Sequence, residues 1–252
     1  MARFKVGAQF HPQHCSMDDL RAGWREADAM GVDTIWNWDH FFPLYGEDDG
    51  PHFESWMQLA AMACDTERAM FGALVTCNSY RNPELLADMA RTVDHLSGGR
   101  AILGLGAGWF ERDYEEYGYE FGTAGDRLRA LEASLPRIRS RLANLNPAPI
   151  GPLPIMIGGG GERVTLRLVA EHADMWNGFG PPESWAKKNA ILDDWCAKIG
   201  RDPKAIERTV QIQANDVDDV EGLLEAGAEH LIVGLGYPFD LAGVQRLLDS
   251  RD

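Results

Sequence analysis

The feature that most restricts the fold of this chain is a regular alternation of short apolar segments with amphipathic ones. Apolar, β-branched and aromatic residues predict eight strands, at 4–10, 34–38, 71–76, 101–105, 154–157, 173–177, 209–213 and 231–234. Segments with helical spacing follow them, at 16–30, 56–66, 82–96, 128–142, 163–172, 185–199, 217–226 and 241–248. Eight strands alternating with eight helices predict an α/β fold, the (β/α)8 TIM barrel. The competing open, doubly wound sheet is less suited to eight near-equal units.

Length, charge and cysteine content narrow the range of functions. The 252 residues match one barrel, so we expect a single domain over residues 1–252. The formal charge of −15 argues against nucleic acid and anionic membranes as partners and favours a small-molecule substrate. No apolar run approaches the length of a membrane span, and the N-terminus lacks a signal-peptide core. The four cysteines are scattered, which predicts reduced thiols in the cytoplasm.

Asp39 and His40 stand side by side where the strand predicted at 34–38 passes into a loop. The loops that follow the strands of such a barrel share the face on which catalytic residues gather. Imidazole titrates near neutrality, and an adjacent carboxylate can orient it or raise its pKa. We therefore interpret His40 as a catalytic group with Asp39 beside it. The alternative is a histidine whose hydrogen bonds are satisfied at a strand edge.

A run of four glycines follows the strand predicted at 154–157. Gly158, Gly159, Gly160 and Gly161 lead into a predicted helix, whose free N–H groups and dipole favour a phosphate. Arg163, expected in the first helical turn, would add a charge-assisted contact. The alternative is a flexible connection without a ligand.

A second glycine-rich segment, 104–108, lacks the full spacing of a dinucleotide fingerprint. We interpret Gly106, Ala107 and Gly108 as backbone kept free of side chains so that a flat ring can lie against it, with Trp109 as an aromatic wall. Tight packing in the barrel mouth explains the glycines equally well. A charged, tyrosine-rich loop is predicted at 111–121. No metal site is predicted, because the histidines at 11 and 14 have no third ligand fixed by a motif.

Together these segments resemble the luciferase-like monooxygenase superfamily, and most closely its actinobacterial branch that uses the deazaflavin coenzyme F420. Each matching segment is weak by itself, but jointly they are specific and follow the family's order over most of the chain. The segments are GVDTIWNWDH (31–40), LVTCNSYRNP (74–83), TVDHLSGGRAILGLGAGW (92–109), PIMIGGGG (154–161) and AEHADMWN (170–177). The resemblance implies a (β/α)8 barrel, in agreement with the pattern of strands and helices.

The resemblance also implies roles for individual residues. It places Asp39 and His40 at the reactive face of the cofactor ring, with His40 as proton donor or acceptor. It matches Leu74 and Val75, followed by Thr76, to a bulge of the third strand, often a cis peptide, that supports the ring from behind. It matches Gly106 and Ala107 to backbone that contacts the ring or its side chain, and Gly158, Gly159, Gly160 and Gly161 to the phosphate loop. Gly108 and Arg163 complete the cofactor contacts that we expect. We expect the substrate pocket to be lined by Phe10, Trp109, Trp176 and Asn177.

Two features depart from the family's pattern. Trp109 stands where the family's sugar-phosphate dehydrogenases carry glutamate, which argues against glucose 6-phosphate as substrate. The connection 144–154 lacks an additional stretch, with a short strand or hairpin, that homologues place there. We expect this missing cover to leave the pocket more open, or to leave a partner subunit to close it. The family's habit and the eight tryptophans predict a homodimer.

Three functions remain open on the sequence. The first is an F420-dependent oxidoreductase that transfers a hydride between the deazaflavin ring and a small organic substrate. The second keeps the fold but uses FMN, as a monooxygenase supplied with reduced flavin by a separate reductase. The third is a carrier or inactive paralogue that binds a flavin-like molecule, or nothing.

Overall fold

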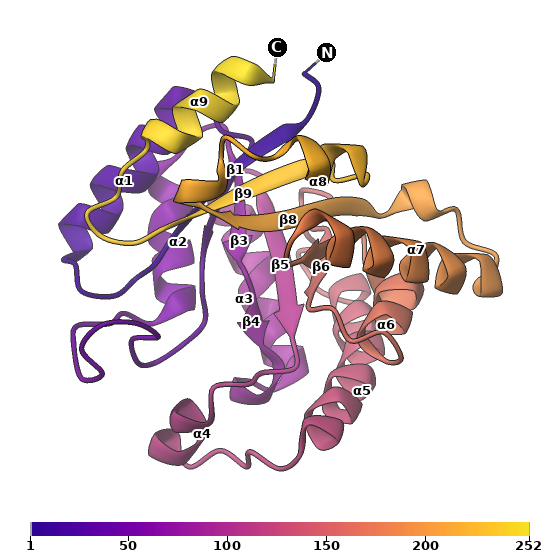
Figure 1. Ribbon diagram of the computed structural model, residues 1–252. Coiled ribbons are helices and arrows are strands. Elements are labelled where there is room, and N and C mark those ends of the chain that lie inside the picture. The colour runs from indigo at the N-terminus through magenta and orange to yellow at the C-terminus, as the bar shows by residue number, and fades with distance from the viewer. Residues whose placement is uncertain (1, 252) are drawn as a thin grey trace.

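The computed structural model describes residues 2–251 and shows a closed barrel of parallel strands surrounded by helices (Figure 1). The sheet runs in the order β3-β2-β1-β9-β8-β7-β6-β5-β4, and a further pairing of β3 with β5 closes the ring. Because β3 and β4 are two parts of one interrupted strand, the sheet corresponds to eight strands around the barrel. The predicted (β/α)8 barrel is thereby confirmed. The strands are β1 (Lys5–Phe10), β2 (Thr34–Asn37), β3 (Met70–Ala73), β4 (Thr76–Cys77), β5 (Ala101–Gly106), β6 (Ile155–Gly158), β7 (Met175–Gly178), β8 (Glu207–Gln213) and β9 (His230–Leu235).

The helices cover the outside of the barrel (Figure 1). They are α1 (Met17–Met30), α2 (Ser55–Asp65), α3 (Pro83–Leu96), α4 (Glu111–Tyr117), α5 (Ala124–Ala143), α6 (Thr165–His172), α7 (Pro182–Ile199), α8 (Glu221–Glu225) and α9 (Ala242–Ser250), with short 3₁₀ turns η1 (Asn78–Tyr80), η2 (Pro203–Ala205) and η3 (Ala214–Asp216). The segment 111–121, predicted to be a loop, contains α4, which projects beside the barrel mouth (Figure 1). No helix within residues 2–251 has the length and apolar composition that crossing a membrane requires.

Local sequence fixes the ends of the helix that precedes the Asp-His pair. Ser16 and Asp19 form a capping box at the start of α1, each satisfying a backbone N–H of the other residue. Gly31 follows the last turn with a φ of 92°, a left-handed conformation that glycine adopts at little cost. The chain therefore turns at Gly31 and enters β2, whose carboxyl end carries Asp39 and His40.

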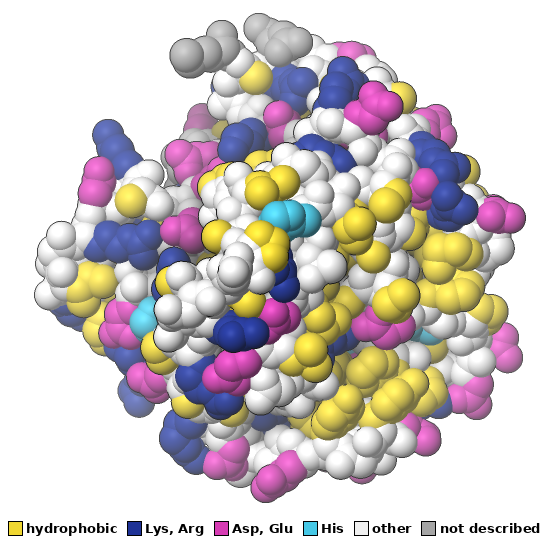
Figure 2. All heavy atoms as spheres, turned by 180° about the vertical axis from the view of Figure 1, so that it is seen from behind, with side chains coloured by type: hydrophobic (Ala, Val, Ile, Leu, Met, Phe, Trp, Pro, Cys, Tyr) yellow, Lys and Arg dark blue, Asp and Glu magenta, His cyan; other side chains and the backbone are white. Residues whose placement is uncertain are grey.

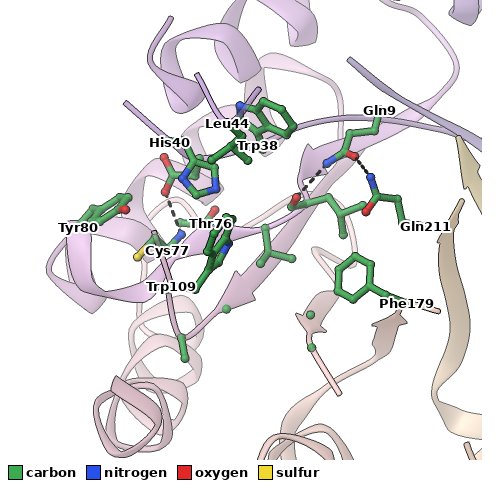
Figure 3. A pocket seen from close by; sticks show the side chains of 18 of the residues that line it. Gln9, Trp38, His40, Leu44, Thr76, Cys77, Tyr80, Trp109, Phe179 and Gln211 are labelled. Carbon is green, nitrogen blue, oxygen red and sulfur yellow. Dashed lines mark hydrogen bonds between the residues drawn. The ribbon is translucent and has the colours of Figure 1, made fainter. Parts of the chain in front are cut away.

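The third strand of the barrel is divided into β3 and β4 by a bulge at Leu74 and Val75. These two residues are joined by a cis peptide bond, as the family resemblance implies. Gln9 donates a hydrogen bond from Nε2 to the Leu74 carbonyl at 3.0 Å, and Gln211 donates to Gln9 Oε1 at 2.6 Å. Two glutamines from β1 and β8 thus fix this carbonyl across the barrel (Figure 3). No sequence pattern predicted that Gln9 and Gln211 hold this bulge.

Most buried apolar side chains lie between the strands and the helices. A smaller cluster consists of Trp36, Leu74, Ile102, Met156, Met175 and Ile232. The residues of this small cluster come from different strands, as expected for side chains that fill the interior of a barrel. This part of the interior is therefore filled by side chains.

The structure corrects the expected effect of the short connection 144–154. Its backbone N–H groups at Ile150 and Gly151 donate to Asp94 Oδ2 at 2.8 and 3.0 Å, near the C-terminal end of α3. Pro152 and Pro154 line a separate cavity with the first residues of β1, β2, β3, β7 and β8. A helix-to-strand connection lies at the amino ends of the strands, opposite the mouth, so the missing stretch does not uncover the mouth.

Candidate active site

A cavity of about 540 Å³ opens at the carboxyl ends of the strands, where this fold places active sites. Loops that follow strands distributed around the barrel contribute to it, and Figure 3 shows His40, Trp38 and Trp109 on one side with Phe179 and Gln211 on the other. The sequence-predicted site residues that line this cavity are Asp39, His40, Leu74, Val75, Thr76, Gly106, Ala107, Gly108, Trp109, Gly158 and Gly159. The Asp-His pair and the first half of the four-glycine run thus share one space.

Three residues expected to line the substrate pocket do not do so. Phe10 is fully buried and packs edge-on against Phe239, with ring centroids 5.1 Å apart. Trp176 is also fully buried and stacks on Trp185 at 5.2 Å. Asn177 has no exposed surface either. Phe10 and Trp176 point outward into the layer between strands and helices, because alternate residues of a strand face opposite sides.

The second half of the glycine run also differs from the expectation. Gly160 and Gly161 lie outside the cavity lining, and Arg163 is exposed and precedes the start of α6 at Thr165. Arg163 therefore does not sit in the first helical turn, where its charge was expected to reach a phosphate. The residue that opens α6, Thr165, lines the cavity instead.

A lysine that no motif indicated lies against the glycine run. Lys188 extends from α7 so that a Cβ placed on Gly160 would approach its Nζ within 2.8 Å. Within residues 2–251 its ammonium group has no hydrogen-bond or ion-pair partner, whereas the neighbouring Lys187 pairs with Glu162 at 3.0 Å. Lys188 thus supplies the positive charge beside the bend that Arg163 was expected to supply.

The glycines at the mouth make room for other parts of the protein. A Cβ on Gly106 would lie 2.6 Å from Val75 Cγ2, and one on Gly158 would lie 2.9 Å from Val75 Cγ1. A Cβ on Gly108 would overlap the Tyr114 hydroxyl. Tight packing, the alternative interpretation of 104–108, therefore accounts for Gly108, and Gly106 both accommodates the bulge and lines the cavity.

His40 is held by a carboxylate from a distant segment. Its Nδ1 lies 2.7 Å from Asp113 Oδ2 on α4, and Asp113 also accepts hydrogen bonds from the Phe41 N–H and the Tyr80 hydroxyl. Asp113 is completely buried. The bond at Nδ1 fixes the ring and leaves Nε2 for contact with a ligand. Asp113 was missed because its segment was predicted to be a loop with no distinguishing motif.

Asp39 is engaged elsewhere and does not orient His40, contrary to the expectation from their adjacency. Both carboxylate oxygens accept from Arg81, at 2.6 and 2.9 Å, and the Cys77 N–H donates at 2.9 Å. Arg81 also pairs with Glu54 at 2.6 Å. Burial raises the pKa of Asp39, and Arg81 opposes that shift. The bidentate geometry requires both oxygens as acceptors, so we describe the pair as ionised.

Trp38 completes this side of the cavity and is fixed by two neutral histidines. It stacks on His11 with centroids 4.2 Å apart, and its Nε1 donates to His52 Nε2 at 2.9 Å. Burial lowers the pKa of both His11 and His52 to about 4. Both rings are therefore uncharged at neutral pH, and neither places a cation beside the indole.

Thr76 carries a polar atom that is buried yet without a partner. Within residues 2–251 its Oγ1 has no hydrogen-bond partner, although Thr76 has no exposed surface and lines the cavity. Leaving a buried hydroxyl unpaired costs about 1–3 kcal/mol, so such groups usually have a partner in the functional state. Thr76 is therefore suited to bond a polar group of a ligand.

Comparison with known proteins agrees with the architecture of this site. The profile of the luciferase-like monooxygenase family matches residues 1–245. The chain belongs to that family. The resemblance inferred from the sequence is thereby confirmed, and so is the expectation of a luciferase-like oxidoreductase enzyme.

Individual relatives use different cofactors. An F420-dependent glucose-6-phosphate dehydrogenase of Amycolatopsis mediterranei is 29% identical over 242 residues, covering 88% of this chain and 72% of that enzyme. A solved F420-dependent secondary alcohol dehydrogenase, in complex with an F420-acetone adduct, has a TM-score of 0.85 at 16% identity over 96% of each chain. The FMN complex of the oxygenating constituent of 3,6-diketocamphane monooxygenase from Pseudomonas putida has a TM-score of 0.76 at 14% identity, covering 100% of this chain and 98% of that one.

Proposed function

We propose that this protein is an F420-dependent oxidoreductase that transfers a hydride between the deazaflavin ring and a small organic substrate. The observation that carries the proposal is the meeting, in one cavity, of an oriented imidazole at His40 with the bulge at Val75 and the glycines at 158 and 159. The F420-dependent relatives support this cofactor.

The residues present fit such a cofactor. The unpaired Thr76 Oγ1 would bond the polar edge of a flat heterocycle that rests on Val75. Gly158 and Gly159 leave backbone free for a phosphate to approach, with Lys188 beside the bend. When bound, F420 supplies the two-electron hydride chemistry that protein side chains lack.

His40 would manage the proton that accompanies the hydride. With Nδ1 bonded to Asp113, its Nε2 can donate a proton to a substrate oxygen or accept one from it. Asp113 would orient the ring and stabilise its protonated form, as a buried carboxylate does for histidine in other enzymes. Asp39, paired with Arg81, keeps the adjacent backbone in place.

The decisive experiment is a binding titration with F420 and with FMN, for the parent protein and for His40→Ala. We expect F420 to bind more tightly, and His40→Ala to retain binding while turnover falls by about 10²–10⁴-fold, the usual contribution of a general acid or base. A clear preference for FMN together with oxygen consumption would contradict the proposal. That result would favour the monooxygenase alternative, which the FMN-bound structural neighbour supports. Cofactor binding without any turnover in the parent would instead support a carrier.

We also propose a homodimer. Large apolar side chains are exposed on the adjacent helices α2 and α3, at Met57, Leu85 and Leu96. Figure 2 shows apolar side chains gathered over one half of the face seen from behind. Exposed apolar side chains gathered on one face commonly mark a protein interface. Sedimentation equilibrium should give twice the chain mass, and a monomer at micromolar concentration would contradict this expectation.

The cytoplasm is the compartment we propose for the protein. All four cysteines are free thiols, as is usual where glutathione or thioredoxin keeps them reduced. Thiol titration of freshly lysed cells would test this, since four reactive thiols after denaturation are expected.

A further inference from the structure

The cavity that would receive the substrate lacks free positive charge. Among residues 2–251 no lysine or arginine lines it. The arginine closest in sequence to the lining residues, Arg81, is bonded to both Asp39 and Glu54 and is almost completely buried. An anionic substrate would therefore lose its hydration on entry without gaining a counter-charge.

The carboxylates around His40 add to this effect. Asp39, Glu54 and Asp113 all lie on the His40 side, and Arg81 is the cation paired with two of them. The chain as a whole carries a formal charge of −15, which also disfavours the approach of anions. Lys188 stands at the glycine bend, outside the cavity lining, where it would serve the cofactor's phosphate.

The rim of the cavity is aromatic and open to solvent. Tyr45 is 64% exposed, Trp109 is 63% exposed and Phe179 is 45% exposed, and each comes from a different loop. The Trp109 ring lies 5.7 Å from the ring of His40, so the rim reaches the reacting group. Large aromatic side chains left uncovered around a pocket indicate a binding surface for apolar molecules.

On these grounds, and resting on the proposed function, we infer that the substrate is an uncharged, mainly apolar ketone or the corresponding secondary alcohol. Its carbonyl would lie beside His40 and its hydrocarbon part against Trp109, Tyr45 and Phe179. In the reductive direction the carbonyl carbon gains a hydride from the reduced deazaflavin while the C=O π bond breaks. The oxygen gains a proton from His40, which is restored from solvent. The ketone is reduced by two electrons and the deazaflavin is oxidised by two.

The test compares ketones that differ in one property at a time. We expect kcat/KM for 2-octanone to exceed that for 7-oxooctanoate, which carries a carboxylate in place of the terminal methyl group, by at least about tenfold. Along the series from 2-butanone to 2-octanone, kcat/KM should rise by up to about fourfold per methylene group, the value for full burial. Glucose 6-phosphate should not be oxidised. Equal or faster turnover of the anionic compounds, or no dependence on chain length, would overturn the inference.

Variants of the rim sharpen this test. Trp109→Ala and Phe179→Ala should lower kcat/KM for 2-octanone more than for 2-butanone. Trp109→Lys should shift the preference toward 7-oxooctanoate by at least several-fold, because it places a cation at the rim. Tyr237→Ala is the matched control, since Tyr237 is an exposed aromatic residue outside the cavity lining. A shift in preference with the control but not with the rim variants would contradict the inference.

Failure of the inference is distinguishable from failure of the proposed function. Binding of F420 is measured separately, and its absence would reject the cofactor alone. Ketone binding to the protein without cofactor is followed by quenching of tryptophan fluorescence, in the parent and in Trp109→Lys. Preference of the parent for 7-oxooctanoate in this assay, or F420-dependent turnover of other compounds but of no ketone, would reject the substrate class alone.

Discussion

The two sides of the cavity are built in different ways. On the polar wall, Asp39, His40 and Tyr80 line the cavity and are held from behind by two further side chains. Asp113 bonds His40 and Tyr80, and Arg81 bonds Asp39. The glycine wall, consisting of Gly106, Gly108, Gly158 and Gly159, presents backbone and derives its shape from the absence of side chains. The geometry of the polar wall therefore depends on side-chain partners from distant segments, and that of the glycine wall depends on the absence of side chains.

This difference separates two tasks. A proton-transferring group must be held in one orientation, which requires hydrogen bonds that lock its ring. A bound phosphate and ring require close approach to the backbone, which any side chain would prevent. Changes to the polar wall should alter catalysis with little effect on cofactor affinity, whereas changes to the glycine wall should alter affinity. The predictions for Asp113, Gly106 and Lys188 below test that separation, and those for His11 and His52 test the support behind the polar wall.

The largest effect should appear in the pH dependence of stability, through the histidines behind the polar wall. The pKa of His11 is about 4 in the folded protein against 6.5 for a model histidine, because burial disfavours the charged form. Below pH 6.5 the unfolded chain binds a proton that the folded chain does not bind until the pH is near 4. The free energy of unfolding should therefore fall as the pH drops through this window, by about 3 kcal/mol from His11 alone. Urea unfolding at several pH values measures it.

A histidine variant tests which residues cause this fall of the free energy of unfolding with pH. His52→Gln should flatten the fall between pH 6.5 and 4, since the pKa of His52 is also lowered to about 4. Glutamine retains an oxygen that can accept the bond from Trp38. His95→Gln is the control, because His95 lies at the end of α3 and bonds the Ala148 carbonyl. An unchanged slope in His52→Gln would contradict the assignment. Below pH 4 the loss should continue, because the pKa of Asp65 and that of Glu207 are lowered to about 2.

Asp113→Asn should strongly impair catalysis while leaving cofactor affinity nearly unchanged. The amide cannot stabilise a protonated His40 as the carboxylate does. A hydrogen bond to a charged group contributes about 1.5–3 kcal/mol, so kcat should fall about 10- to 100-fold. Glu115→Gln on the same helix is the matched control, because Glu115 is exposed. An altered pH profile of kcat in Asp113→Asn, with parental F420 affinity, is the expected signature. A loss of F420 affinity as large as the loss of kcat would contradict the separate roles of the polar wall and the glycine wall.

Gly106→Ala should disturb the glycine wall. Its Cβ would lie 2.6 Å from Val75 Cγ2, so the bulge must shift, at a cost of about 1–3 kcal/mol. We expect weaker F420 binding and a smaller effect on kcat at saturating cofactor. The double variant Gly106→Ala/Val75→Ala removes the overlapping methyl groups and should restore part of the affinity. Equal losses in the single and double variants would exclude this steric explanation.

Lys188→Ala should have the smallest effect. A partly exposed lysine contributes about 0.5–1 kcal/mol to binding an anion, which corresponds to a two- to fivefold weaker affinity for F420. Screening should reduce the difference as the salt concentration rises. Lys187→Ala serves as the control, since Lys187 already pairs with Glu162. Isothermal titration at two salt concentrations measures both, and an equal loss in the control would argue against a specific role for Lys188.

The alternation of strands and helices was sufficient to predict the barrel, the position of Asp39 and His40 at its mouth, and the position of the glycines at 158 and 159. These features follow from short-range patterns, because every strand of a parallel barrel ends at the same face. The direction of a side chain was harder to predict. Phe10 and Trp176 were assigned to the pocket, but neighbouring residues of a strand face opposite sides and only the register decides which side is inside.

Only the tertiary structure decided which groups pair. Asp113 reaches His40 from 73 residues away, and Arg81 reaches Asp39 from 42 residues away. Lys188 comes to Gly160 from a different helix. Local sequence determines where an element such as α1 begins and ends, because the capping box at Ser16 and the left-handed Gly31 depend on local hydrogen bonds and backbone conformation. A contact between side chains of distant elements depends on how helices pack on the barrel, and adjacency in the chain, as at Asp39 and His40, does not determine it.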